Sequence, residues 1–344
     1  MSAKHRGRFI WHELNTTDVA GAEKFYRALT GWGVQNYENN PAYKLWTTGT
    51  VGRGGLMLLP DDAKAMGAPP NWLVYIAVPD VDASVRQAES LGAKTVVPAQ
   101  DIPGTGRFAI VTDPQGAPIS LFAPAPRDNE PPEAGPVVGE FSWHDLATTD
   151  SAAAWSFYEK MFGWKKGHAM DMGPQGTYQM FGRDAFTYGG MYNMSAGMPG
   201  RPAWLSYILV KNVDAVLAKI TALGGRVVNG PMDVPGGDRV VMCVDPQGAA
   251  FALHSKGAAM SQPAQAKPAA KAAAKPKPAA ARVKAKTRPK AKTTSKVKTK
   301  AKAKTKARPK PKAKSRVKAR TKARPKAKPK TKSRKPARRA RSKK

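Results

Sequence analysis

Two carboxylates in matching surroundings are the residues of this chain best suited to acid–base chemistry. Glu13 and Asp145 lie 132 positions apart, and each follows a Trp-His pair and precedes a leucine. Strand alternation places each carboxylate on the same face as the tryptophan two positions before it. In an apolar environment such a carboxylate has a raised pKa and can act as a general base. The alternative, which we favour because paired buried charges are commoner than catalytic ones, is an ion pair with Arg107 or Arg239 in a late strand of each copy.

The two histidines that precede these carboxylates face the other side of the predicted strand. His12 and His144 are expected to lie against a covering helix. We interpret them as structural histidines, hydrogen-bonded beneath that helix, because a metal site needs several donors that converge. The alternative is a metal site in which His12 or His144 acts together with Glu13 or Asp145.

The chain repeats itself at a constant offset of 132 residues. Residues 9–14 return as residues 141–146, and residues 113–116 return as residues 245–248. Thr-Thr-Asp, Phe-Tyr, Gly-Trp and Trp-Leu motifs recur between them in the same order. A repeat of this length indicates two copies of one folded module.

Each module is predicted to contain a strand, a helix and several strands, in an order that occurs twice. In module one a strand at residues 9–14 precedes a helix that Asp18 caps and Gly31 ends. A second helix begins near Val81 and ends at Gly92, and an Asp-Pro-Gln-Gly turn joins the last two strands. The first helix carries apolar residues at spacings of three and four: Ala22, Phe25, Tyr26 and Leu29. The fold class is therefore α+β, with two βαβββ units in each module and four in the chain.

Composition divides the chain into module one at residues 7–124, a proline-rich linker at 125–138, module two at 139–257 and a polybasic tail at 258–344. The chain holds 58 Lys and Arg against 24 Asp and Glu, a net charge of +34. Residues 260–344 contain 36 of these basic residues and no acidic residue, which leaves residues 1–259 with a net charge of −2. The positive charge therefore belongs to the tail.

The motifs of the two modules, in this order, resemble the glyoxalase/bleomycin-resistance/dioxygenase superfamily, also called vicinal oxygen chelate. The resemblance covers residues 8–124 and 140–255, and the Trp-x-Glu-Leu strand is similar to two-module glyoxalase-like proteins sometimes labelled hydroxylases. It implies paired βαβββ units whose sheets curl into a cup around a small ligand, often over a divalent metal.

The positions that hold the metal in this superfamily carry poor ligands in this chain. The resemblance places them on Trp11, Leu73 and Ser120 in module one, and on Trp143, Leu205 and Ala252 in module two. Apart from one weak hydroxyl, these side chains cannot ligate a divalent metal. We therefore expect cups without a cofactor; a divalent metal held by other residues is the alternative.

The resemblance and strand alternation together give a set of cup-lining candidates. The ligand-binding residues are expected to be Trp11, Tyr75, Arg107, Ser120, Phe122, Trp143, Tyr207, Arg239 and His254. The aromatic members could surround a ligand, but packing within the core would also explain them. His254 stands where module one has Phe122, which marks either a more polar site or an exposed strand end.

The tail has a composition of its own, in which Lys or Arg alternates with Ala, Pro, Thr and Val. It resembles the tails of linker histones and of bacterial histone-like proteins. Frequent proline and the lack of aromatic residues predict a disordered polycation that binds DNA or RNA through phosphates, without reading base sequence. The alternative is a solubilising extension. A membrane-surface role is disfavoured because no apolar face accompanies the charge.

These observations leave three functions open. The first is a metal-independent small-molecule binding protein or enzyme that the tail tethers to nucleic acid. The others are a metal-dependent lyase or dioxygenase, and a nucleic-acid-compacting protein with a folded head. An N-terminus without an apolar core and the single Cys243, expected to be a buried thiol, favour the cytoplasm, at the nucleoid if the tail engages DNA.

Overall fold

The computed structural model describes residues 5–126, 133–198 and 200–257, in which two modules follow one another. Both modules lie in one compact unit, Met1–Ala269. The predicted tail and residues 127–132 of the predicted linker lie outside the described residues. Among the residues described, there is no helix with the length and apolar character needed to cross a membrane.

Module one is an eight-stranded sheet with strand order β2-β3-β4-β1-β5-β8-β7-β6. Its elements are β1 (Phe9–Thr16), α1 (Val19–Thr30), β2 (Gly33–Tyr37), β3 (Asn40–Thr48), β4 (Val51–Leu58), α2 (Asp61–Ala65), β5 (Asn71–Ala77), α3 (Val81–Ser90), β6 (Lys94–Ile102), β7 (Gly106–Thr112) and β8 (Pro118–Pro124).

Module two repeats this sheet in the order β10-β11-β12-β9-β13-β16-β15-β14. Its elements are β9 (Phe141–Thr148), α4 (Ser151–Phe162), β10 (Lys165–Asp171), a 3-10 helix at Gly173–Gln175, β11 (Thr177–Arg183), β12 (Phe186–Asn193), β13 (Ala203–Leu209), α5 (Asp214–Ala222), β14 (Arg226–Asp233), β15 (Arg239–Val244) and β16 (Ala250–Ser255). The predicted α+β fold of four βαβββ units is confirmed.

The first helix of each module forms where its caps and apolar spacing predict. The Asp18 side chain accepts a hydrogen bond from the Gly21 N–H at the start of α1, and Gly31 ends the helix with φ 76°. All four predicted apolar positions of α1 are buried. Asp150 and Gly163 cap α4 in the same way.

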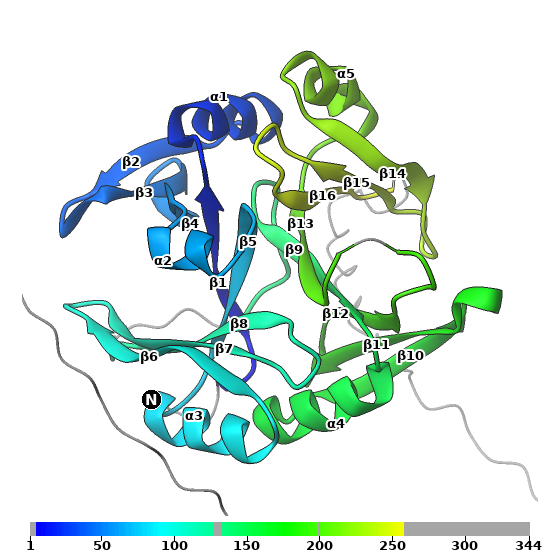
Figure 1. Ribbon diagram of the computed structural model, residues 1–344. Helices are drawn as coiled ribbons and strands as arrows, with labels where there is room; N and C mark the ends of the chain where they lie inside the picture. The colour runs from blue at the N-terminus through cyan, green and yellow to red at the C-terminus, as the bar shows by residue number, and fades with distance from the viewer. Residues whose placement is uncertain (1–4, 127–132, 199, 258–344) are drawn as a thin grey trace, which may run out of the picture. The chain divides into compact units, whose positions relative to one another are not determined.

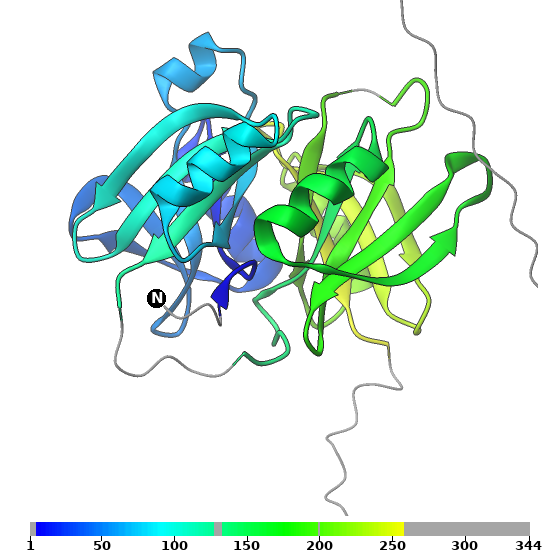
Figure 2. The same ribbon diagram turned by 90° about the horizontal axis from the view of Figure 1, so that it is seen from below.

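The two hydrophobic cores are shared between the modules. One contains buried residues of α1 and β1 together with residues of α5, β15 and β16. The other combines β5, β7 and β8 with α4, β11 and β12. Accordingly α1 lies beside α5, and α3 beside α4 (Figures 1 and 2). Each module therefore completes the core of the other.

Two equivalent hydrogen bonds also connect the modules, one in each direction. The Tyr26 hydroxyl of α1 donates to Asp245 Oδ2 at 3.1 Å, and the Tyr158 hydroxyl of α4 donates to Asp113 Oδ2 at 2.9 Å. Both aspartates belong to the Asp-Pro-Gln-Gly turns that the sequence repeats. Each turn is thus held by the first helix of the other module.

Candidate functional site

Each sheet has one face covered by helices and a second face that carries a buried carboxylate. We call the second face of module one cup 1, marked by Trp11 and Glu13, and that of module two cup 2, marked by Trp143 and Asp145. Apolar clusters surround these pairs. Along β1 and β9 the tryptophan and the carboxylate point into the cup while the histidine between them points away from it, as the sequence predicts.

In cup 1 uncharged donors hold Glu13, which is 7% exposed. The Tyr75 hydroxyl donates to Glu13 Oε2 at 3.0 Å, and Asn15 Nδ2 lies 3.4 Å from Oε1. The Tyr43 hydroxyl also bonds this carboxylate and accepts from Trp11 Nε1 at 3.0 Å. The aromatic residues of the cup thus form a hydrogen-bonded cradle around one carboxylate.

Cup 2 repeats this cradle around Asp145, which is 4% exposed. The Tyr178 hydroxyl donates to Oδ1 at 2.6 Å, and Trp143 Nε1 donates to the same oxygen at 3.0 Å. The Tyr207 hydroxyl donates to Oδ2 at 2.7 Å. Both oxygens therefore accept a short hydrogen bond from a phenol.

Burial dominates the electrostatics of both cradles. It raises the pKa of Glu13 and of Asp145, and the hydrogen bonds from the tyrosines only partly oppose this shift. Burial and the nearby carboxylates also raise the pKa values of the phenols, that of Tyr192 in cup 2 to about 12. At neutral pH the phenols therefore stay protonated and donate, while the carboxylates are the groups able to accept a proton.

A glycine in each module makes room for the cradle. A Cβ atom at Gly55 would overlap the Tyr43 hydroxyl, and one at Gly190 would overlap the Tyr178 ring. Both glycines lie in the strand beside the first strand of their module, paired with Glu13 and Asp145. The tyrosines can cross these positions to reach the carboxylates only because no side chain stands there.

The structure brings together most of the predicted site residues. Trp11, Glu13 and Tyr75 meet in cup 1, as Trp143, Asp145 and Tyr207 meet in cup 2. Buried Ser120 pairs in register with Tyr75, and Phe122 belongs to the apolar cluster of cup 1. His254 lies at the end of β16 and is 6% exposed, so it does not mark an exposed strand end.

The two arginines do not join the cups, and the ion pairs predicted for them with the carboxylates are wrong. Arg107 pairs with Asp82 of α3 at 2.8 Å, and Arg239 pairs with Asp214 of α5 at 2.7 Å. Both arginines thus lie on the helix side, because their neighbours in the strand, such as Phe108, face the cup. The sequence placed them in the correct strands but could not show that aspartates of the covering helices stand opposite them.

Sequence reasoning missed Tyr43 and Tyr178, which complete the cradles. The offset of 132 is not constant, because these tyrosines stand 135 positions apart, as do Gly55 and Gly190. Strands β10 and β11 with the turn between them are three residues longer than their counterparts, and the offset returns to 132 before Trp204. A search that allowed this insertion would have matched Tyr43 and Gly54-Gly55 in module one with Tyr178 and Gly189-Gly190 in module two.

The two histidines face away from the cups, as predicted, but their main partner is each other. His12 Nε2 lies 2.7 Å from His144 Nε2, and His144 Nδ1 donates to the Tyr188 carbonyl at 3.0 Å. His144 Nε2 must then accept, and His12 Nε2–H must donate. Each imidazole stacks on a phenylalanine, His12 on Phe141 and His144 on Phe9. Burial lowers the pKa of both, that of His144 to about 4.

The donor sets of the cups do not fit the divalent metal that the resemblance implies. Each cradle offers a single carboxylate, and its other groups are phenols, an indole or an amide that already donate hydrogen bonds. Across the described ranges, three or more His, Cys, Asp or Glu residues nowhere converge on a common point. A divalent metal prefers several nitrogen, sulfur or carboxylate ligands.

Comparisons with known proteins agree with this architecture. Residues 8–121 and 140–253 each match a family model described as Glyoxalase/Bleomycin resistance protein/Dioxygenase superfamily. The chain is 34% identical over 264 residues to the putative glyoxylase CFP32 of Mycobacterium tuberculosis, covering 73% of this chain and 96% of that protein. It is 28% identical over 275 residues to the anthracycline biosynthesis protein DnrV of Streptomyces peucetius, covering 72% and 92%.

Two solved structures share the fold. The 2,3-dioxygenase LapB from Pseudomonas sp. KL28 has a TM-score of 0.52 at 14% identity and covers 74% of this chain and 94% of its own. A variant of homoprotocatechuate 2,3-dioxygenase from B. fuscum has a TM-score of 0.54 at 18% identity, covering 75% and 74%. These likenesses show the arrangement of strands and helices, which two dioxygenases share with this chain.

Proposed function

The chain belongs to the Glyoxalase/Bleomycin resistance protein/Dioxygenase superfamily, and from this premise we propose that each cup binds a small organic molecule without a metal ion, with Glu13 or Asp145 as the group that accepts a proton. The ligand we propose is a planar carbonyl compound. It fits the partly exposed indoles of Trp11 and Trp143, which offer ring faces for stacking.

One observation carries the proposal: within the described residues, the groups that hydrogen-bond the two carboxylates are all uncharged. A buried carboxylate that serves only structure is commonly paired with a cation, but Asp113 and Asp245, which hold the turns, also have uncharged partners and a pKa raised by burial. Glu13 and Asp145 differ from them in lying in a cup beside a partly exposed indole, and their raised pKa suits a general base that works near neutral pH.

The cradle also offers a partner for the charge that such a reaction creates. When the carboxylate takes a proton from the carbon beside a carbonyl group, the electron pair of the C–H bond forms a C=C bond and the π pair of the carbonyl group moves onto its oxygen. The phenols of Tyr75 or Tyr207 are then free to donate to that oxygen, since the protonated carboxyl no longer needs both donors. The names of the two relatives, a glyoxylase and an anthracycline biosynthesis protein, are consistent with carbonyl and planar aromatic ligands.

Binding can be tested with 1,4-dihydroxyanthraquinone as the probe and tryptophan fluorescence as the readout, with EDTA in the buffer. We expect two binding sites per chain in the wild type and weaker binding in Trp11→Ala Trp143→Ala. Trp155→Ala is the matched control, because Trp155 lies on α4 and not in a cup. Binding that EDTA abolishes would contradict metal independence and favour the metal-dependent alternative. Equal affinity in the double variant and the wild type would contradict the assignment of the cups.

We further propose that residues 260–344 tether the protein to DNA or RNA. The support is charge alone: 36 Lys and Arg without an acid, on a body of net charge −2. Such a segment binds phosphates by releasing counterions, so log affinity falls linearly with log salt, with a slope of about −0.9 per phosphate contact on duplex DNA. On this proposal the protein resides in the cytoplasm, with the nucleic acid.

The tether is tested by salt titrations of the full chain, a chain ending at Gly257 and a peptide of residues 260–344 on two unrelated duplexes. The full chain and the peptide should bind both duplexes alike, and the shortened chain should lose this affinity. Equal binding by the shortened chain would favour a nucleic-acid surface on the folded part and contradict the tether.

A further inference from the structure

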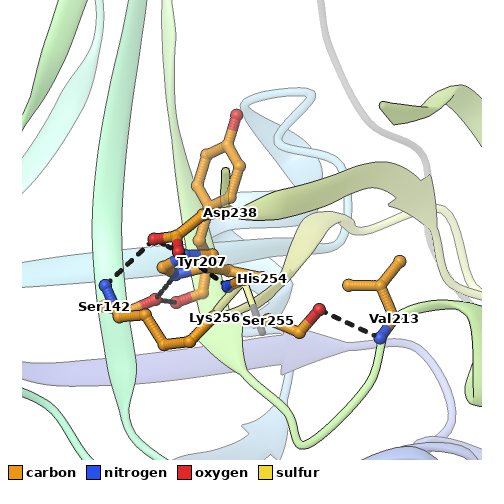
Figure 3. A network of polar contacts seen from close by, with 8 residues as sticks. Ser142, Tyr207, Val213, Asp238, His254, Ser255 and Lys256 are labelled. Atoms are coloured by element: carbon orange, nitrogen blue, oxygen red, sulfur yellow. Dashed lines mark hydrogen bonds and ion pairs between the residues drawn. The ribbon is translucent and has the colours of Figure 1, made fainter. Parts of the chain in front are cut away.

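A second polar cluster lies at one end of the module-two sheet, apart from the Asp145 cradle. Ser142 Oγ lies 2.8 Å from His254 Nδ1, and His254 Nε2 lies 2.8 Å from Asp238 Oδ2. Figure 3 shows the three side chains in a row, with Lys256 beside Asp238. A serine, a histidine and a carboxylate are thus joined in the order that nucleophilic serine sites use.

Module one shows that the fold does not require this cluster. At the matching positions it has Ile10, Phe122 and Gly106, and the strands of Ile10 and Phe122 pair as those of Ser142 and His254 do. The two sheets share their strand order, so the hydroxyl, the imidazole and the carboxylate have no counterpart in the scaffold. Module two therefore carries a polar constellation where its copy is apolar.

A β-bulge aims the serine. Trp143 pairs with Tyr207 and Phe141 pairs with Ile208, so Ser142 is an extra residue between two register positions. Bulges redirect one side chain, and module one has the same bulge at Ile10, so the bulge belongs to the scaffold and only the serine at this position is particular to module two. Ser142 is half-buried at this bulge. Its hydroxyl hydrogen-bonds His254 Nδ1 at 2.8 Å and makes a longer contact of 3.3 Å to the Tyr207 carbonyl.

The hydrogen bonds fix where the protons lie. Asp238 accepts from the Gly257 N–H at 3.0 Å and from Lys256 Nζ at 3.0 Å. These bonds and that from His254 lower its pKa, while burial lowers the pKa of His254. At neutral pH Asp238 is therefore ionised and accepts the Nε2–H of a neutral His254. Nδ1 keeps its lone pair and accepts the proton of Ser142.

We propose that Ser142 is a nucleophile, activated by His254 and positioned by Asp238, that reacts with small acyl esters and related electrophiles. The hydroxyl proton passes to His254 Nδ1 as Oγ bonds to the carbonyl carbon. The ester C–O bond then breaks, and the leaving alkoxide takes that proton. Water repeats the sequence and releases the acid. Here Nδ1 faces the serine and Nε2 faces the carboxylate, the reverse of the chymotrypsin-type triad. The proposed site does not use Glu13 or Asp145.

The test uses the full chain and a fluorophosphonate probe, because simple esters would also acylate the lysines of the tail. Attack forms an Oγ–P bond, breaks the P–F bond and releases fluoride, and peptide mass spectrometry locates the adduct. We expect Ser142 to be labelled at least about 10²-fold faster than exposed Ser90, whose hydroxyl donates to the Gln87 carbonyl. Labelling of Ser142 no faster than Ser90 in the wild type would overturn the proposal.

Two variants separate activation from mere exposure of the serine. His254→Phe installs the residue that module one carries, which its matching strand accommodates, and should slow labelling about 10²-fold. In Asp238→Asn the amide oxygen is a weaker acceptor than the carboxylate, and the amide N–H can donate to His254 Nε2. The imidazole then carries its proton on Nδ1, which can no longer accept the proton of Ser142. Labelling should therefore slow by about 10²-fold or more. Circular dichroism checks that both variants are folded. Wild-type labelling rates in both folded variants would contradict the proposal as well.

Discussion

The two cups share one scaffold but differ in how tightly they hold their carboxylate. Asp145 receives hydrogen bonds of 2.6 and 2.7 Å from two phenols, whereas Glu13 receives one of 3.0 Å from Tyr75, a second phenol bond from Tyr43 and an amide contact of 3.4 Å. Cup 2 also has Tyr192 where cup 1 has Met57. The tryptophans, the crossing tyrosines and the glycines beneath them are the same in both.

This difference separates what the fold needs from what a site needs. Groups present in both cups, such as the Trp-to-Tyr hydrogen bond, come with the duplicated module. Groups present in one module only, such as Tyr192 and the Ser142 cluster in module two and Asn15 in module one, are not required by the fold. Cup 2 therefore holds its carboxylate with the shorter hydrogen bonds, and the experiments below go from the largest expected effect to the smallest.

The largest effect should come from the cores that the modules share. Phe251 packs against Phe25 and Tyr26 of module one, and Ile119 holds the matching position in the other core. Phe251→Ala should lower the free energy of unfolding by about 3–5 kcal/mol and Ile119→Ala by about 2–5 kcal/mol. Urea denaturation followed by fluorescence and by circular dichroism should show one shared transition. Two separate transitions would mean that the modules fold independently.

The next effect concerns the histidine pair between the modules. Burial depresses the pKa of both imidazoles in the folded state, so the unfolded chain binds more protons as the pH falls through their ordinary value. Stability is therefore complete above pH ~6.5 and falls towards pH 4, by about 2 kcal/mol at pH 5 for His144 alone.

Urea denaturation between pH 7 and pH 5 measures this loss. His12→Gln His144→Gln should reduce the slope of unfolding free energy against pH, because the double variant lacks the titrating groups. The raised pKa values of Glu13 and Asp145 favour the folded state as the pH falls, which opposes the effect of the histidines. This contribution is the same in the wild type and in the double variant. An identical slope in the variant would show that this pair stays charged or exposed.

A smaller effect compares the two cradles directly. Tyr207→Phe removes a 2.7 Å donor from Asp145, and Tyr75→Phe removes a 3.0 Å donor from Glu13. Hydrogen bonds to charged groups contribute about 1.5–3 kcal/mol, so at pH 7 we expect a loss near the upper value for Tyr207→Phe and near the lower one for Tyr75→Phe. Thermal denaturation measures both. A larger loss for Tyr75→Phe would reverse the ranking of the cups.

The sequence predicted the fold in detail, because the information that defines it is local or repeated. Asp18 and Gly31 mark the ends of α1, and the apolar spacing between them gives its buried face. The turn at Asp113 was also recognised from its residues. What could not be predicted is that Asp113 bonds Tyr158 of the other module, since this contact depends on how the modules pack.

The site was predicted only where the repeat kept its register. Glu13 and Asp145 were found at the offset of 132, whereas Tyr43 and Tyr178 were hidden by a three-residue insertion. The ion pair with Arg107 failed for a different reason. A strand pattern gives the face of a residue only if its register is known, and Arg107 lies on the face of Asp82.

The central claim is that each cup holds a buried carboxylate able to accept a proton without a metal ion. The most direct measurement is a carbon-13 NMR titration of the side-chain carboxyl groups in the full chain, with Glu13→Gln and Asp145→Asn used to assign the two signals. We expect both pKa values above those of ordinary carboxyl groups, and unchanged when Zn²⁺ or Mg²⁺ is added. A pKa at or below the ordinary value for both groups, or a fall of both on adding metal, would contradict the account.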